Sequence, residues 1–330
     1  MAGSWRALPP QLEVSDHELK KATPWLLQSG AGALAWRRVA TSSLAISDAG
    51  MELQQAYRLH TLRALKHERY ITRVLTLLHR EGIEPILVKG WSVARLYPER
   101  GLRPYGDIDL CIAPADFARA ERVLKNTEGS LSQVDLHCDF QKFDNRSWKS
   151  MYQRSVVAEL EGVEVRMLCP EDQLQLLSFH FLREGAWRPL WLCDIALLLE
   201  TRPESFLWPV AIKEGKRSDW LACSLLLAHQ LLNANLDGVP STMVSKRLPR
   251  WFVPCVLREW IKPSMPIRHR LPLHKSSLSP IETLNALRAR WPNKIEGTVG
   301  VGGPFNEVPR LPFQMAHCFL RASKYLSLPI

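Results

Sequence analysis

The sequence predicts an α+β fold in which a small mixed β-sheet lies between two helical regions. Apolar residues recur at helical spacing from Met51 to Arg80, short runs with strand character follow between residues 84 and 168, and apolar helical stripes return from Glu171. The expected regions are a helical region over 1–83, a mixed core over 84–170 and a helical region over 171–330 that contains a Gly- and Pro-rich loop near 291–312.

The elements follow from the periodicity in chain order. Residues 16–82 are predicted helical, with Gly82 as the stop signal. The predicted strands are Pro85–Val88, Asp107–Ile112, Gln133–Cys138 and Val163–Leu168. The predicted helices that follow residue 90 are Trp91–Tyr97, Pro114–Lys125, Glu171–Arg183, Leu190–Leu199 and Trp220–Ala234.

The composition is that of a globular protein with a basic surface. The 330 residues are 46% hydrophobic and 23% charged, which excludes a disordered chain and a disulfide mini-scaffold. The 43 Lys and Arg residues exceed the 33 Asp and Glu residues, giving a net charge of +10. That charge indicates a polyanionic partner, which is a nucleic acid, an anionic membrane surface or a phosphate-bearing small molecule.

The cysteines and the apolar runs indicate the compartment. Seven scattered cysteines without a Cys-x-x-Cys pair are typical of free thiols in a reducing cytosol. No signal peptide begins the chain, and the longest apolar stretches are too short to span a bilayer. We therefore expect a cytoplasmic protein without a membrane partner.

Two carboxylates lie two residues apart in the second predicted strand. Asp107 and Asp109 project from the same face, because side chains alternate along a strand. Their mutual repulsion is relieved by a divalent cation, and Mg²⁺ is commonly held by one or two carboxylates together with substrate phosphates. The alternative is a solvated strand end that carries two acidic residues.

A glycine turn precedes this strand. Lys89, Gly90 and Ser92 lie where the first predicted strand runs into a helix, a layout that offers backbone N–H groups to an anion. Gly90 permits close backbone approach, Ser92 supplies a hydroxyl group and Lys89 supplies charge. The alternative is an ordinary strand–helix turn with a surface lysine.

The third predicted strand repeats the period-two pattern. Asp135 and His137 share one face, and a strand paired beside Asp107 and Asp109 would complete a three-carboxylate cluster. Such a cluster can hold two metal ions about 4 Å apart for an in-line phosphoryl displacement. Asp135 could also accept the proton of an acceptor hydroxyl. We expect His137 to be a structural histidine rather than a ligand.

Taken together and in this order, these motifs mark a known family. The run from Leu87 to Tyr97, Arg103 with Asp107-Ile-Asp109, and Val134-Asp-Leu-His137 resemble the nucleotidyltransferase superfamily with the DNA-polymerase-β-like fold. They are most similar to a branch of poorly characterised bacterial nucleotidyltransferases. The resemblance spans about residues 50–200.

The resemblance implies the reaction and the site. It implies Mg²⁺- or Mn²⁺-dependent transfer of a nucleoside monophosphate from an NTP, expected to be ATP, to an acceptor hydroxyl group. Asp107 and Asp109 match the metal-binding pair, and Asp135 matches the third carboxylate. Gly90 and Ser92 fall at the turn that holds the triphosphate. Trp91 separates them, a departure that assigns part of the phosphate binding to Lys89 or Arg103.

Other hypotheses remain at this stage. The chain could be a non-catalytic, nucleotide-binding accessory protein that keeps the fold. It could also bind nucleic acid through residues 241–275, which contain eight Lys and Arg residues, one acidic residue, and the aromatic residues Trp251, Phe252 and Trp260. A solvated basic flank fits this composition equally well. His180 and Asp194 are expected to pack the C-terminal helices. The sequence does not distinguish a small molecule, a peptide, a protein or an RNA end as the acceptor.

Overall fold

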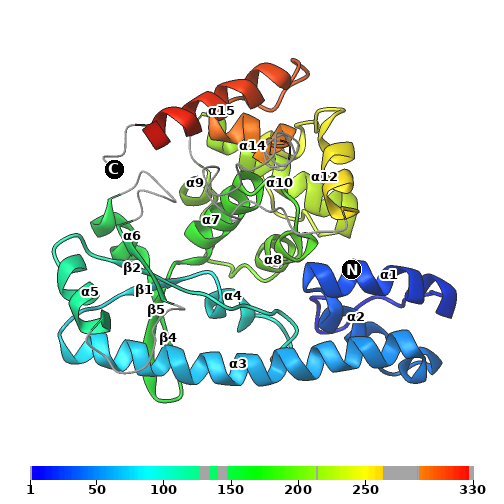
Figure 1. Cartoon of the computed structure of the whole chain (residues 1–330), viewed down its shortest axis with the longest axis horizontal. Helices are drawn as coiled ribbons and strands as arrows, with labels where there is room; N and C mark the ends of the chain where they lie inside the picture. Colours follow the sequence, from blue (N-terminus) through cyan, green and yellow to red (C-terminus); the bar gives the residue numbers. More distant parts are fainter. Residues whose placement is uncertain are drawn as a thin grey trace, which may run out of the picture.

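A five-stranded mixed sheet forms the centre of the computed structural model (Figure 1), which describes residues 2–125, 134–139, 147–212, 215–262, 288 and 290–326. Its order is β3-β2-β1-β5-β4; β1 pairs antiparallel with β2 and parallel with β5, β2 pairs parallel with β3, and β4 pairs antiparallel with β5. The α+β prediction is confirmed. The strands are β1 (Ile86–Val88), β2 (Ile108–Ile112), β3 (Val134–Cys138), β4 (Val156–Leu160) and β5 (Val163–Met167).

The N-terminal helices begin at clear capping residues. Ser15 starts α1 with a capping box, in which its hydroxyl oxygen accepts from the backbone N–H of Glu18 and the Glu18 carboxylate accepts from the backbone N–H of Ser15. Ser47 caps α3, which has 33 residues and lies along one edge of the molecule (Figure 1). The elements are α1 (Asp16–Ser29), α2 (Gly32–Val39), the 3₁₀ turn η1 (Ser43–Ile46) and α3 (Asp48–Arg80).

The two faces of the sheet are buried against different helices. Alternate residues such as Leu87 and Leu110 share a core with the apolar side of α3 and with α5 (Phe117–Lys125). Their neighbours Val88 and Cys111 face a second core, to which the C-terminal helices contribute most residues. Asp109 alternates with Ile108 and Leu110, so its side chain lies on the second face.

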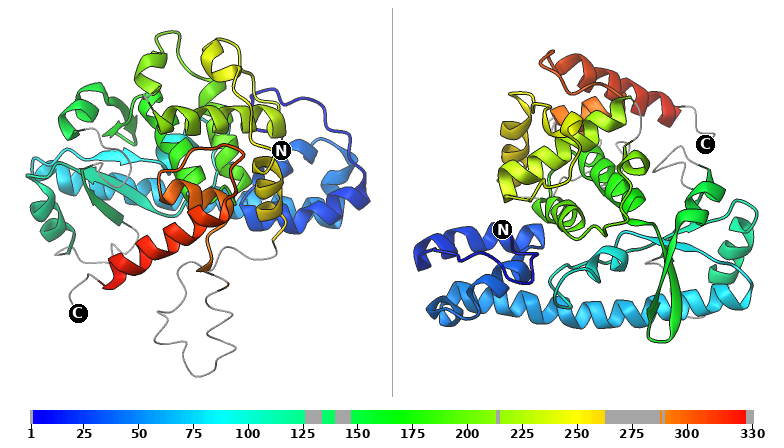
Figure 2. Two further views of the ribbon diagram at one scale, coloured as in Figure 1. Left: turned by 90° about the horizontal axis from the view of Figure 1, so that it is seen from above. Right: turned by 180° about the vertical axis from the view of Figure 1, so that it is seen from behind.

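The C-terminal half is a layer of helices above the sheet (Figure 2). The large core combines residues from all three expected regions, among them Trp5, Val88 and Phe181. The remaining helices are α4 (Trp91–Ala94), α6 (Trp148–Arg154), α7 (Pro170–Arg183), α8 (Pro189–Glu200), α9 (Trp208–Ala211), α10 (Lys216–Leu232), α11 (Ser241–Val244), α12 (Phe252–Trp260), α14 (Lys294–Gly300) and α15 (Leu311–Leu326).

Several elements differ from the expectation, among them the predicted helix over 16–82, which is divided into α1, α2, η1 and α3, and the unpredicted helix α6. Strand β4 is not in the predicted set; it forms a hairpin with β5 through Glu161 and Gly162, which both have positive φ as in a two-residue hairpin turn. Part of the glycine-rich stretch near 291–312 is the helix α14 rather than a loop. A Cβ atom on Gly297 would lie 2.8 Å from the Cα of Gln314, so this glycine allows α14 to pack closely on α15.

Part of the basic segment 241–275 is engaged in the fold where it is described, up to residue 262, while Arg247, Arg250 and Arg258 are exposed. Lys246 pairs with Asp219, and Lys262 pairs with Glu259 at 2.7 Å. The Trp251 indole N–H donates to the backbone oxygen of Asn306. Residues 263–275 lie outside the described part. Among the described helices, none combines the length and the apolar character needed to cross a membrane.

Candidate active site

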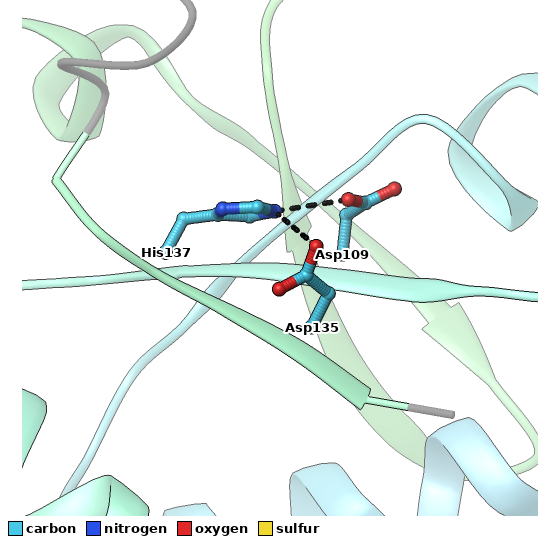
Figure 3. A group of neighbouring side chains, drawn as sticks. All are labelled: Asp109, Asp135 and His137. Atoms are coloured by element: carbon cyan, nitrogen blue, oxygen red, sulfur yellow. Dashed lines mark hydrogen bonds and ion pairs between the residues drawn. The ribbon is translucent and has the colours of Figure 1, made fainter. Parts of the chain in front are cut away.

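An acidic group lies on two adjacent parallel strands. Asp109 of β2 and Asp135 of β3 are direct partners in the register, and His137 lies two residues further along β3. The His137 Nε2 atom is 3.0 Å from Asp109 Oδ1 and 3.4 Å from Asp135 Oδ2 (Figure 3). One ligand atom from each of the three residues lies within 4.8 Å of the others. We call Asp109, Asp135 and His137 the acidic group.

The acidic group is buried at one end and open at the other. The side chains of Asp109 and His137 are 14% and 6% exposed, whereas that of Asp135 is 63% exposed. Burial raises the pKa of the Asp109 carboxyl, but the hydrogen bond with His137 and the charge of Lys89 outweigh it and hold that pKa below its ordinary value. Asp109 is therefore ionised at neutral pH, and Asp135 faces the side from which a substrate can approach.

The Lys89–Gly90 turn brings a cation to the acidic group. Lys89 Nζ is 3.6 Å from Asp109 Oδ1. Both residues have positive φ, 56° for Lys89 and 47° for Gly90, and backbone strain of this kind clusters at functional sites. A Cβ atom on Gly90 would lie 3.3 Å from the Asp107 backbone oxygen, so glycine lets the turn approach the start of β2.

Asp107 does not join the acidic group. It is exposed and precedes the first residue of β2. The charge of Asp107 acts to raise the pKa of His67, but the burial of His67 lowers that pKa more strongly. The structure thus brings together Asp109 and Asp135 from the predicted carboxylates, and adds His137, which we expected to be structural. The period-two pattern that pairs Asp135 with His137 already contained this signal.

Ser92 is used inside the fold. Its side chain is buried, its hydroxyl donates to the Lys89 backbone oxygen at 2.7 Å, and it accepts from Gln173 Nε2 of α7 at 2.9 Å. These two bonds hold the Lys89 turn against α7. The structure therefore places the Ser92 hydroxyl in support of the turn instead of at its surface.

Arg103 also has a partner other than the expected phosphate. Its guanidinium group is buried and donates to Asp194 of α8 at 2.9 and 3.2 Å, and the Tyr97 hydroxyl donates to the same carboxylate at 2.8 Å. Burial raises the pKa of Tyr97 well above its ordinary value, so the phenol remains a donor. Asp194 thus pairs with Arg103 rather than with His180, and ties the segment before β2 to α8.

Several cations face the side of α7 next to the turn. Burial lowers the pKa of His180 well below its ordinary value, and the nearby charges of Lys89, Arg183, Arg103 and Arg188 lower it further. Burial and the charge of Arg103 lower the pKa of Arg188 to about 10. Sequence reasoning missed Arg188, since it precedes α8 and lies more than 75 residues beyond β2. Three of these cations, Lys89, Arg103 and Arg183, are each paired with a carboxylate.

The donor set of the acidic group fits a divalent metal ion. Two carboxylates and one imidazole nitrogen within 4.8 Å offer ligands that Mn²⁺ accepts readily, and the carboxylates also suit Mg²⁺. Lys89 Nζ adds a positive charge next to these ligand atoms. Sites of phosphoryl transfer commonly combine metal-binding carboxylates with a cation of this kind.

Comparison with known proteins decides the family. The family described as "Uncharacterised nucleotidyltransferase" matches residues 16–130 and 127–233, about two thirds of the chain. The chain belongs to this family. The nucleotidyltransferase is a transferase by this membership, and its acidic group and turn both lie inside the matched residues.

One solved structure resembles the nucleotidyltransferase. It is an antigenic nucleotidyltransferase-like protein from Paracoccidioides brasiliensis, 14% identical, with a TM-score of 0.36 over 49% of this chain and 87% of that chain. No curated protein matches the chain.

Proposed function

We propose that the nucleotidyltransferase moves a nucleoside monophosphate from an NTP, expected to be ATP, to an acceptor hydroxyl group with release of pyrophosphate. The observation that carries the proposal is the register of β2 and β3, which sets Asp109 beside Asp135 with His137 Nε2 between their oxygens. Asp109, Asp135 and His137 would hold Mg²⁺ or Mn²⁺, which would stabilise the charge that develops on the phosphoryl oxygens.

The protein groups divide the remaining work. Lys89, held in its turn by Gly90 and Ser92, would contact the phosphates. Asp135, the most exposed member, would accept the proton of the acceptor hydroxyl at a carboxylate oxygen. Asp107, which is exposed and directly precedes β2, would act as a further metal-binding carboxylate when substrate is bound. Arg103 would act through Asp194 by positioning the segment that leads into β2.

The test is a pyrophosphate-release assay with each of the four NTPs, read together with the mass of candidate acceptors. We expect a mass gain of one nucleoside monophosphate, and a loss of more than about 100-fold in rate for the double variant Asp109→Asn, Asp135→Asn. The matched control is Asp116→Asn, a partly buried aspartate outside the site that pairs with Arg119 at 2.7 Å. Unchanged turnover in the double variant would contradict the proposal.

The accessory-protein hypothesis predicts a different result. Isothermal titration would show nucleotide binding by the wild-type chain, yet no acceptor would yield pyrophosphate. Binding that disappears in the double variant without any release in the wild type would assign the site to nucleotide recognition alone.

A further inference from the structure

The outer side of α3 carries a row of exposed cations. Residues 66, 69, 73 and 80 fall within about 60° of one another on a helix of 3.6 residues per turn, on the side away from the buried Ile71, Leu75 and Leu78. We call the full set of exposed cations the basic row. Its members are Arg58, Arg63, Lys66, Arg69, Arg73 and Arg80.

Few acidic residues lie among the cations of the basic row. Between Leu53 and Arg80 the single acidic residue is Glu68, which is buried and bound by Arg100 at 3.0 Å. Six cations and one acid give this stretch a net charge of +5, while the exposed acids of α3, Asp48 and Glu52, lie before it. The helix as a whole has a net charge of +3, and all of its Lys and Arg residues lie beyond residue 57.

Repulsion within the basic row works against the stability of α3. Cations three or four residues apart on a helix, such as Lys66 and Arg69 or Arg69 and Arg73, destabilise it by about 0.2–0.5 kcal/mol per pair. The apolar side of α3 is already buried against the sheet, so the helix does not need the row for packing. A polyanion laid along α3 would remove the repulsion.

The dimensions and chemistry favour a nucleic-acid duplex. From residue 58 to residue 80 the row extends about 33 Å, close to one turn of a duplex. Five of its six members are arginine, whose planar guanidinium group binds phosphate in a bidentate manner. One aromatic ring, Tyr70, lies among these cations and packs partly against the core below α3, whereas a single strand needs a series of rings on which successive bases stack. A membrane is less favoured because most of the apolar side of α3 is buried against the sheet, which leaves Leu59 and Leu62 exposed among the cations.

We propose that the basic row binds the phosphate backbone of a nucleic-acid duplex without reading its sequence. The row lies on the outer side of α3, below the sheet in Figure 1, whereas the acidic group lies on the opposite face of that sheet. The inference therefore goes beyond nucleotidyl transfer and does not depend on it. Binding is expected to persist in Asp109→Asn, which removes a proposed metal ligand.

The test measures fluorescence anisotropy of labelled 20-base-pair RNA and DNA duplexes of mixed sequence between 50 and 200 mM NaCl. Six phosphate contacts predict a slope near −5 in log affinity against log salt, or a loss of about 10³-fold over this range. The variant Arg63→Gln, Lys66→Gln, Arg69→Gln should lower the slope by about 3 and weaken binding at 50 mM at least about tenfold.

The matched control removes the same charge elsewhere. Lys20, Lys21 and Lys149 are exposed residues outside the row, so the triple glutamine variant of these three should keep the wild-type slope. Thermal melting of both variants checks that they fold. Four results would overturn the proposal: no duplex binding at 50 mM salt, an equal loss in the control, loss of binding in Asp109→Asn, or equal affinity for poly-glutamate or phosphatidylserine vesicles.

Discussion

At the scale of single residues, Asp194 is a fully buried charge with two partners. It accepts hydrogen bonds from both Arg103 and Tyr97. Removing one partner of a buried pair leaves the other charge uncompensated, so Asp194→Ala should lower the free energy of unfolding by about 3–5 kcal/mol. Urea unfolding measures this loss. Asp116→Ala, which breaks a pair whose side chains are 32% and 43% exposed, should lose less, about 1 kcal/mol.

His137 should decide which metal ion the site prefers. Imidazole nitrogen is a better ligand for Mn²⁺ than for Mg²⁺, so the wild-type protein should bind Mn²⁺ more tightly than Mg²⁺. The variant His137→Gln should weaken Mn²⁺ binding by about tenfold and change Mg²⁺ binding less. Titration calorimetry and the electron paramagnetic resonance spectrum of Mn²⁺ measure both affinities. Equal losses for the two ions would show that His137 only orients the carboxylates.

The ionisation of Asp109 predicts a pH dependence of stability. Its pKa in the folded protein lies below the ordinary 3.8, so the ionised carboxylate stabilises the fold above that pH, and the contribution is lost as the pH falls through the folded value. In the presence of EDTA, the difference in unfolding free energy between wild type and Asp109→Asn should be full at pH 5–7 and shrink below pH 4. A difference that is constant with pH would contradict this assignment.

The sequence predicts part of the site at this scale. Asp109, Asp135 and His137 share a face because strands alternate, and that regularity is readable along the chain. The partners of Ser92 and Arg103 are not readable, since Gln173 and Asp194 lie 81 and 91 residues further along the chain on α7 and α8. Tertiary packing therefore engages two side chains that local motifs suggested for phosphate binding.

At the scale of elements, the turn between β1 and α4 depends on Gly90. Gly90 has a φ of 47° and a ψ of −119°, and a Cβ atom there would crowd the Asp107 backbone oxygen. Gly90→Ala should therefore destabilise the protein by about 1–3 kcal/mol. It should also weaken nucleotide binding, because it would displace Lys89. Gly162→Ala is the control, because it also has positive φ but no atom within 4 Å of the added Cβ. It should destabilise less and leave nucleotide binding unchanged.

The strands show which elements local patterns can predict. β1 and β2 are continuous buried runs, and both are predicted. β4 is missed because its first residues are exposed, so neither alternation nor a continuous apolar run marks it. The glycines of α14 read as a loop because the reason for them, close contact with α15, lies in another element.

At the scale of the whole molecule, the net charge of +10 could not be located from composition. The sequence drew attention to residues 241–275, where tryptophans lie between cations. The structure packs Trp251 into the fold and pairs Lys246 and Lys262. Arg247, Arg250 and Arg258 are exposed, as are the cations of the basic row on α3. Which side of a long helix is buried depends on the sheet that covers it, so the basic row becomes visible only in three dimensions.

The shared core predicts that the sheet cannot stand alone. A fragment of residues 84–170 would expose the sheet face that the C-terminal helices bury and would leave Arg103 without Asp194. We expect this fragment to lack a cooperative thermal transition, measured by circular dichroism, whereas the full chain shows one. A cooperative transition in the fragment would contradict the role assigned to the shared core.

The Arg103–Asp194 pair also bears on how such a protein can evolve. A recombination event that joined this sheet to a foreign helical half would bury a guanidinium group against a surface with no carboxylate to receive it. The two halves are therefore matched at this pair, and a hybrid protein would need a carboxylate at the position of Asp194 to receive the guanidinium group.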